Sequence, residues 1–318
     1  MTSEVGSDLI RSLGVFISKY VDDTKLGREI ALEQHCHKLQ HALNELVEWS
    51  NEWGMELHAE KTTVVHFGRT NPEFVYTING VPLNTTEAAR DLGVKIRNDC
   101  DSSLHVREIT GKAHALLGQM KRTLSYRDSV VLPKIYTTYV RPALEYAVQV
   151  WNPSKVCDVK EIEKVQKRAM RLVTDQGYMP YESKLQFLGL PTLEARRKRG
   201  DQIETFKIIN GHSKLRKEDF FNHVKDRHSV ETRNFTNDLL VMEQCSLNVR
   251  KNFFSCRVVN DWNSLPNHVR MSTSVNEFKN NYDDFLSTVN STVFKMISTH
   301  HVVVNLYAIG RAGRCIHI

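Results

Sequence analysis

The stretch that decides the fold is GVFISKYVDDTKLGREI, residues 14–30, in which a short acidic turn separates two strand-like runs. Residues 14–20 predict a strand, Val21-Asp22-Asp23 a tight turn and residues 24–30 a possible return strand. β-Branched and aromatic residues favour strands, whereas aspartate favours turns. Together the three segments predict a hairpin with adjacent carboxylates at its tip.

The paired carboxylates of this hairpin admit two interpretations. Carboxylates on an apolar hairpin are costly to bury unless their charge is neutralised. Mg²⁺ would neutralise them, because it prefers hard oxygen ligands and takes one or two carboxylates together with substrate phosphates. The simpler interpretation is an exposed turn, in which aspartate is common. The four residues from Tyr20 to Asp23 alone leave both interpretations open.

A mixed pattern of helix and strand follows the hairpin. Residues 31–53 predict a helix, because their apolar residues recur at spacings of three, four and seven, and Gly54 suits its end. Short strands are predicted at residues 62–67, 74–78 and 92–96. Asn79-Gly80 predicts a two-residue hairpin turn that joins residues 74–78 to residues 81–83.

Beyond Asn98 the pattern becomes helical. Candidate helices lie at residues 104–124, 129–139, 142–151, 159–174, 181–188 and 193–210. Pro142 is suited to a first helical position. After Leu215 the pattern weakens, and the remaining elements are predicted strands at residues 239–242 and 253–259 and a helix at residues 274–286.

The composition places the chain among globular proteins of the cell interior. Its 318 residues are 41% hydrophobic and 25% charged, and no apolar run approaches the roughly 18 residues of a membrane span. No signal peptide is visible at the start. The six cysteines form no C-x-x-C pair, which predicts reduced thiols in a nuclear or cytoplasmic protein without a zinc ribbon.

Positive charge is concentrated in one part of the chain. The net charge is only +6, but residues 159–199 hold ten basic and five acidic side chains. Such a stretch indicates either a polyanionic partner or a solvated helix face, and charge alone does not separate the two.

Several segments resemble one family. ISKYVDDTKLG, residues 17–27, resembles the catalytic segment of reverse transcriptases from non-LTR (LINE-type, jockey/CR1-like) retrotransposons. Further segments resemble the same family in the same order, at residues 46–68, 78–96, 139–153, 162–173, 188–211 and 253–269. The resemblance extends over residues 14–286 and implies the C-terminal part of an RNA-directed DNA polymerase.

The resemblance implies an α+β fold. It predicts a partial right-hand polymerase palm, made of the YVDD hairpin, a helix and short strands, followed by a helical thumb and a mixed C-terminal region. The predicted divisions are residues 1–98 for the palm, 99–215 for the thumb and 216–286 for a C-terminal extension. Residues 287–318 resemble no part of the family and are expected to be a disordered or unrelated tail.

The resemblance also implies site residues. Asp22 and Asp23 match the metal-binding position, where the intact family holds two Mg²⁺ ions. Lys61 matches a lysine near the nucleotide phosphates, and Leu92-Gly93 matches the primer-grip turn. Tyr20 is expected to pack behind the catalytic turn. Lys61 could instead be an ordinary surface lysine, and Gly93 only a turn glycine.

Two basic groups are the candidate nucleic-acid contacts. The expected partners are an RNA template, a DNA primer and their duplex, with deoxynucleotide triphosphates as substrates of the intact enzyme and no membrane. Contacts to the backbone of such a duplex read shape and charge rather than sequence. The candidates are Lys160, Lys164, Lys167, Arg168 and Arg171 in one predicted helix, and Arg196, Arg197, Lys198 and Arg199 in another.

The chain departs from the family pattern before the hairpin. The family has another metal-binding aspartate on an earlier strand, and only Asp8 precedes Tyr20 here. Two-metal chemistry needs that carboxylate, so the chain is predicted to be a truncated polymerase, inactive by itself. The alternatives are a non-catalytic nucleic-acid-binding remnant that uses the thumb helices, and a non-functional translation product.

Overall fold

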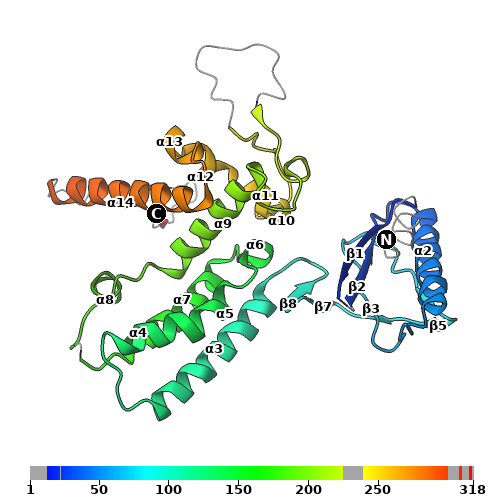
Figure 1. Cartoon of the computed structure of the whole chain (residues 1–318), viewed down its shortest axis with the longest axis horizontal. Helices are drawn as coiled ribbons and strands as arrows, with labels where there is room; N and C mark the ends of the chain where they lie inside the picture. The colour runs from blue at the N-terminus through cyan, green and yellow to red at the C-terminus, as the bar shows by residue number, and fades with distance from the viewer. Residues whose placement is uncertain are drawn as a thin grey trace. The chain divides into compact units, whose positions relative to one another are not determined.

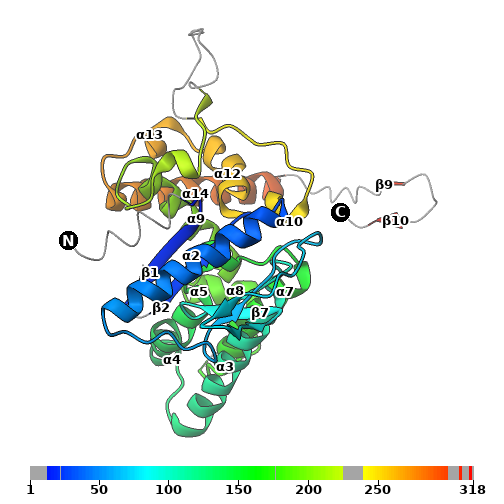
Figure 2. The same cartoon turned by 90° about the vertical axis from the view of Figure 1, so that its right-hand side faces the viewer.

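The computed structural model describes residues 13–21, 23–175, 177–224, 239–299, 308–309 and 315–316, with side chains in the long C-terminal helix described to residue 289. The chain divides into two compact units, Met1–Glu194 and Ala195–Ile318. Their elements are drawn in Figure 1 and, turned by 90°, in Figure 2.

The first unit begins with the acidic hairpin. Strand β1 (Phe16–Tyr20) pairs antiparallel with β2 (Asp23–Gly27), and Tyr20 lies opposite Asp23. This register confirms the predicted hairpin and places Val21 in its turn. Val21 has φ of 55°, the left-handed backbone that tight hairpin turns require. Asp22 itself lies outside the described residues.

Helix α2 (Glu33–Glu52) packs along the hairpin. Four buried side chains form the core between them: Val15, Ile17, Ala42 and Leu46. Ala42 and Leu46 are four residues apart and therefore share one face of the helix. This small cluster is what fixes the hairpin against the rest of the region.

The remaining strands of the first unit form small two-stranded sheets. β3 (Thr63–Val64) pairs parallel with β6 (Asn84–Thr85), β4 (Thr77–Ile78) pairs with β5 (Val81–Pro82), and β7 (Ala88–Asp91) pairs with β8 (Val94–Arg97). The predicted turn at Asn79-Gly80 is confirmed, with φ of 51° and 77°. The strands that it joins are shorter than expected. Residues 92–96 were expected to be extended throughout, but Leu92 and Gly93 form a turn before β8 begins.

Helices make up the rest of the first unit. They are α3 (Ser103–Thr123), α4 (Val131–Ile135), the π-helical turn η1 (Tyr136–Val140), α5 (Arg141–Glu145), α6 (Val148–Trp151), α7 (Val156–Arg171) and α8 (Tyr181–Phe187). Helices α3 and α7 pack against each other around a continuous apolar core. Its fully buried members include Val106, Leu117, Leu132, Ile162 and Val165.

The prediction that Pro142 starts a helix is wrong in one respect. α4, η1 and α5 form one continuous helical run from residue 131 to residue 145, and Pro142 is the second residue of α5. Within η1 the Arg141 N–H bonds to the carbonyl of Tyr136, five residues back. The wider π turn lets the helix continue through a proline, which has no N–H to donate.

In its described residues up to 299, the second unit is helical apart from one isolated β-bridge. Its elements are α9 (Leu193–Ile209, which begins before the boundary), the 3-10 turn η2 (Lys217–Asp219), α10 (Asn248–Lys251), α11 (Phe254–Arg257), α12 (Val259–Ser264), α13 (Asn267–Arg270) and α14 (Val275–Thr299). Aromatic rings form the centre of the core, where Phe206 and Phe278 stack with centroids 4.5 Å apart, next to Trp262.

The predicted strand at residues 253–259 is wrong. Phe254, Val258, Val259 and Trp262 are all buried, and their spacing of three to four residues places them on one helical face. Residues 239–242 contain only an isolated bridge between Leu240 and His223. The predicted helix at residues 274–286 is confirmed as α14.

The four-part division at residues 98, 215 and 286 stays a prediction, as does the partial palm. Within the predicted tail, α14 continues to Thr299, and β9 (Ala308–Ile309) pairs with β10 (Cys315–Ile316). The other tail residues from 300 onward lie outside the described part of the chain.

Candidate functional site

The acidic turn presents its carboxylate to solvent. Asp23 is exposed at the start of β2, and Val21 beside it is 91% exposed. Tyr20 was expected to pack behind the turn, but its side chain is 62% exposed, because the core under the hairpin lies on the side of Val15 and Ile17. An exposed oxygen donor at a hairpin tip is compatible with a hard divalent cation that keeps several waters.

Lys61 lies in a turn after α2. Its N–H bonds to the carbonyl of His58 at 3.2 Å, and its side chain is exposed. Its predicted position near nucleotide phosphates stays a prediction, because no described contact joins it to the acidic hairpin.

The Leu92-Gly93 turn is held on two sides. The hydroxyl of Tyr146 donates a hydrogen bond to the carbonyl of Leu92 at 3.0 Å, and the guanidinium of Arg90 donates to the carbonyl of Gly93 at 3.2 Å. Leu92 and Gly93 have φ of 44° and 88°. The positive φ of Gly93 favours glycine at this position, whereas a Cβ there would lie 3.6 Å from the ring of Tyr146, an ordinary van der Waals distance.

An ion pair connects this turn to the acidic hairpin. Lys25 on β2 pairs with Asp91, the residue directly before Leu92. The structure therefore brings together two of the predicted site segments, the acidic hairpin and the Leu92-Gly93 turn. Lys25 and Asp91 are two residues of this link that sequence reasoning missed.

A second set of charges fixes β7 to α3. Arg90 and Lys112 both pair with Glu108, with Lys112 Nζ 2.7 Å from the carboxylate. The hydrogen bonds from Arg90 and then Lys112 lower the pKa of Glu108 to about 2. Glu108 therefore stays ionised at neutral pH and holds the Leu92-Gly93 turn in place through Arg90.

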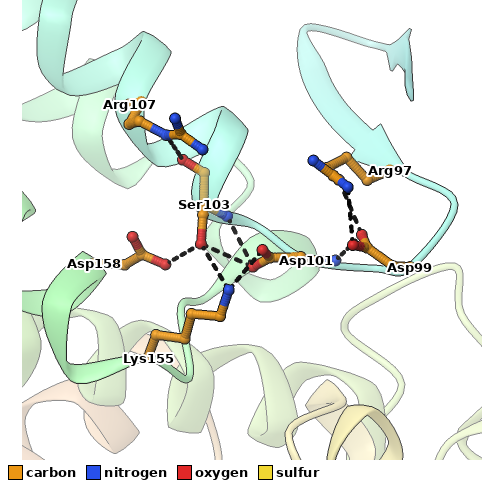
Figure 3. A network of polar contacts seen from close by, with 7 residues as sticks. All are labelled: Arg97, Asp99, Asp101, Ser103, Arg107, Lys155 and Asp158. Atoms are coloured by element: carbon orange, nitrogen blue, oxygen red, sulfur yellow. Dashed lines mark hydrogen bonds and ion pairs between the residues drawn. The ribbon is translucent and has the colours of Figure 1, made fainter. Parts of the chain in front are cut away.

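A polar network joins the starts of α3 and α7 (Figure 3). The hydroxyl of Ser103 donates to Asp158 at 2.6 Å, and the ammonium of Lys155 donates to Asp101 at 2.7 Å. Partial burial raises the pKa of Asp101, but hydrogen bonds from Lys155 and Ser103 outweigh it, and the net shift is downward. The network thus fixes the position of α7 relative to the strand β8 that precedes α3.

The basic residues of α7 lie opposite its buried face. Lys160, Lys164, Arg168 and Arg171 are exposed, whereas Ile162, Val165, Ala169 and Met170 are buried in the core. Two of the predicted cations also make local contacts, since Lys164 pairs with Glu161 and Lys167 Nζ lies 4.9 Å from the ring centre of Tyr181.

A neighbouring part of α3 extends this basic face. A Cβ on Gly118 would lie 3.7 Å from Arg122 and 4.0 Å from Arg168 of α7, so two guanidinium groups lie over a residue without a side chain. Arg122 and Gly118 were missed from the sequence, because the pairing of α3 with α7 cannot be read from either helix alone.

The Arg196–Arg199 run is not a uniform basic surface. Arg197 is only 2% exposed. Arg199 forms a bidentate ion pair with Asp283 of α14, with both N–O distances 2.7 Å. At least these two arginines serve the packing of the second unit. Arg196 is partly buried and Lys198 is exposed.

Helices of membrane-spanning length and apolar character are absent among the described residues. No protein-family model matches the chain, and no solved structure matches it.

Known proteins similar to this chain are polymerases of mobile elements. It is 30% identical over 132 residues to "Probable RNA-directed DNA polymerase from transposon X-element" of Drosophila melanogaster, which covers 40% of this chain and 14% of that protein. It is 26% identical over 165 residues to "RNA-directed DNA polymerase from mobile element jockey" of Drosophila funebris. This match covers 50% of this chain and 18% of that protein.

A third relative, "Probable RNA-directed DNA polymerase from transposon BS" of Drosophila melanogaster, is 24% identical over 169 residues, covering 51% of this chain and 19% of that protein. The matched part thus spans less than a fifth of the length of each of these relatives. All three are named as polymerases of transposable elements, and the chain is similar over 40–51% of its length to RNA-directed DNA polymerases of non-LTR retrotransposons.

Proposed function

We propose that this chain is a fragment of an RNA-directed DNA polymerase, with the acidic hairpin as its metal-binding segment. The observation that carries the proposal is the link between the exposed Asp23 turn and the Leu92-Gly93 turn through Lys25 and Asp91. In a polymerase the metal-binding carboxylates and the segment that holds the primer end must stay in fixed register, which such a link favours.

Asp22 and Asp23 would hold Mg²⁺ in this proposal. The bound ions would activate the primer hydroxyl and stabilise the leaving pyrophosphate. Lys61 would lie near the triphosphate as a positive charge or proton donor. The role of the chain's own residues is to hold these groups and to keep the primer end at the Leu92-Gly93 turn.

We also propose that the chain by itself does not extend a primer. A pair of metal ions needs carboxylates from more than one position to stay in register. In the described part of the chain, Asp23 belongs to no group of three or more metal-binding side chains. A further carboxylate has to join Asp22 and Asp23 before the chemistry can proceed.

The basic face of α7 supports a second candidate function, non-catalytic binding of a nucleic-acid duplex. Lys160, Lys164, Arg168 and Arg171 lie on a helix packed in the large core, and Arg122 of α3 lies near Arg168. Such a face would bind phosphates through charge, and its affinity would fall steeply with added salt.

One experiment tests both functions. The purified chain is mixed with an RNA template annealed to a DNA primer, deoxynucleotide triphosphates and Mg²⁺, and both primer extension and duplex binding are measured. We expect binding without extension. Extension that disappears in the Asp22→Asn plus Asp23→Asn variant would overturn the inactivity proposal, and absence of binding at low salt would overturn the nucleic-acid role.

A further inference from the structure

Three side chains with metal-binding atoms converge in the second unit, outside the proposed polymerase site. They are Glu243, Cys245 and Cys256, and their ligand atoms all lie within 4.8 Å of one another. In the described part of the chain this is the only group of three or more such residues. Glu243 and Cys245 precede α10, and Cys256 lies in α11 (Figure 1).

The distances fit one tetrahedral cation. The two thiol sulfurs are 3.8 Å apart. With Zn–S bonds of about 2.3 Å, two thiolates at a tetrahedral angle are separated by about 3.8 Å. Cys256 Sγ lies 3.8 Å from Glu243 Oε2, close to the roughly 3.5 Å expected between a sulfur and an oxygen ligand of the same ion. A disulfide would need the sulfurs at about 2.05 Å.

Charge and outer contacts also fit a bound cation. Arg250 donates to Glu243 Oε2 at 2.7 Å, and its guanidinium lies 5.3 Å from the ring centre of Phe253. A hydrogen-bonded outer partner of this kind orients a ligating carboxylate. Two thiolates and one carboxylate carry three negative charges, which a divalent cation and Arg250 together neutralise.

The group borders a pocket that leaves room for a fourth ligand. The pocket has a volume of about 440 Å³, and it is lined by the three residues together with Lys251, Arg257 and Asn260. Cys245 and Cys256 are only partly exposed, and both line the pocket. Three protein ligands with an open fourth position are one of the two common arrangements of zinc.

We propose that Glu243, Cys245 and Cys256 form a binding site for a thiophilic divalent cation, Zn²⁺ above all, whose fourth position is filled from the pocket. The bound ion joins the segment before α10 to α11. It therefore stabilises this part of the second unit by binding the folded state in preference to the unfolded chain. The sequence does not predict the site, because the two cysteines are eleven residues apart in sequence and form no C-x-x-C pair.

The test is a titration of the whole chain with Co²⁺, after metal has been removed under a phosphine reductant. We expect one equivalent to produce the visible bands of tetrahedral cobalt and a thiolate-to-cobalt charge-transfer band, both displaced by Zn²⁺. Cys245→Ser and Cys256→Ser should each abolish the charge-transfer band or lower the affinity severely. Cys157→Ser, which changes an exposed cysteine of α7, is the matched control and should bind as the wild type does.

Two further measurements separate ligation from a merely structural effect. Arg250→Met should weaken Co²⁺ binding about 10-fold to 100-fold while keeping the spectrum, as loss of an outer partner does. Circular dichroism melting of each variant without metal should match that of the wild type. Added Zn²⁺ should raise the melting temperature of the wild type and of Cys157→Ser, but not that of Cys245→Ser or Cys256→Ser.

Three outcomes would overturn the proposal. One is the absence of a charge-transfer band with the folded wild type, and another is a band that survives in both Cys245→Ser and Cys256→Ser. The third is a reduced chain that binds neither Co²⁺ nor Zn²⁺ but exchanges with glutathione disulfide, forming a Cys245–Cys256 disulfide and releasing two glutathione thiols. That result would assign the pair to thiol chemistry instead.

Discussion

The strand-rich and helical regions of the first unit bury their apolar residues in different ways. Residues 103–193 share one continuous core, to which β8 adds Val94. Residues 13–97 contain two small clusters beside α2, and each described sheet there has only two strands. A helix satisfies its own backbone hydrogen bonds, whereas a two-stranded sheet leaves both edges unpaired and is marginal without further packing.

This difference separates the two proposed functions. The acidic hairpin lies in the region with the smaller cores, so its geometry depends on the few contacts from α2 and on the Lys25–Asp91 pair. The basic face of α7 lies on the region with the large core. Duplex binding should therefore withstand changes to the chain that would disorder the acidic hairpin.

The largest expected effect is a loss of stability in the large helical core. Leu117→Ala removes a fully buried side chain from the centre of α3 and should lower the free energy of unfolding by about 2–5 kcal/mol. Ile17→Ala, in the four-residue cluster under the hairpin, should cost about 2 kcal/mol or less, because its neighbours are fewer. Urea unfolding followed by circular dichroism measures both, with the exposed Gln119→Ala as control. Equal losses at the two positions would contradict the distinction.

The next effect concerns duplex binding by the basic face of α7. Lys164→Glu, Lys167→Glu and Arg171→Glu together should reduce the salt dependence of duplex binding by about 2 to 3 in the slope of log K against log salt concentration. Fluorescence anisotropy with a labelled RNA–DNA duplex gives this slope.

The matched control for this variant reverses three exposed charges outside α7: Lys38, Arg69 and Lys134. It changes the net charge equally and should leave most of the slope intact. If both triple variants lowered the slope alike, overall charge rather than the α7 face would be responsible.

A smaller effect tests the contact between the two regions. Tyr146→Phe removes the hydrogen bond to the carbonyl of Leu92, and it should cost about 0.5–1 kcal/mol, because the tyrosine is partly exposed. Hydrogen exchange of amides in β7 and β8 should speed up, while amides in α7 stay protected. Faster exchange throughout α3 and α7 would show that the contact supports the helical core instead.

The smallest effect concerns pH. The pKa of Glu108 is lowered to about 2 in the folded chain, below its ordinary value, so its ion pairs add stability above the ordinary pKa. That contribution is lost as the pH falls through the carboxylate range toward 2. The difference in urea midpoint between wild type and Glu108→Gln should thus shrink from pH 7 to pH 3. Gln119→Ala, at an exposed position of α3, changes no titrating group and should show no such trend.

Sequence reasoning predicted the parts of this structure that local patterns determine. The hairpin, the Asn79-Gly80 turn and helices α2, α3, α7 and α14 all have strong local signals. The strand expected at residues 253–259 was wrong, because short runs of apolar residues fit a buried helix as well as a strand, and only the packing of Phe254 and Trp262 decides between them.

The site was predictable only in part for a related reason. Asp23 and the α7 cations stand in recognisable segments, but Lys25–Asp91 and the contact of Tyr146 with Leu92 join residues 66 and 54 positions apart. Such pairings depend on the tertiary arrangement. The buried state of Arg197 has the same origin, since a run of four basic residues gives no sign of which one turns inward.

The π turn at Tyr136–Val140 determines the direction in which the later side chains of the same helical run point around the helix axis. It accommodates one residue more than a regular helix would between the same two ends, and one residue corresponds to a rotation of about 100°. Deleting a single residue there would restore a regular helix and swing Tyr146 around the axis, away from the carbonyl of Leu92. The extra residue thus orients Tyr146 toward the Leu92-Gly93 turn.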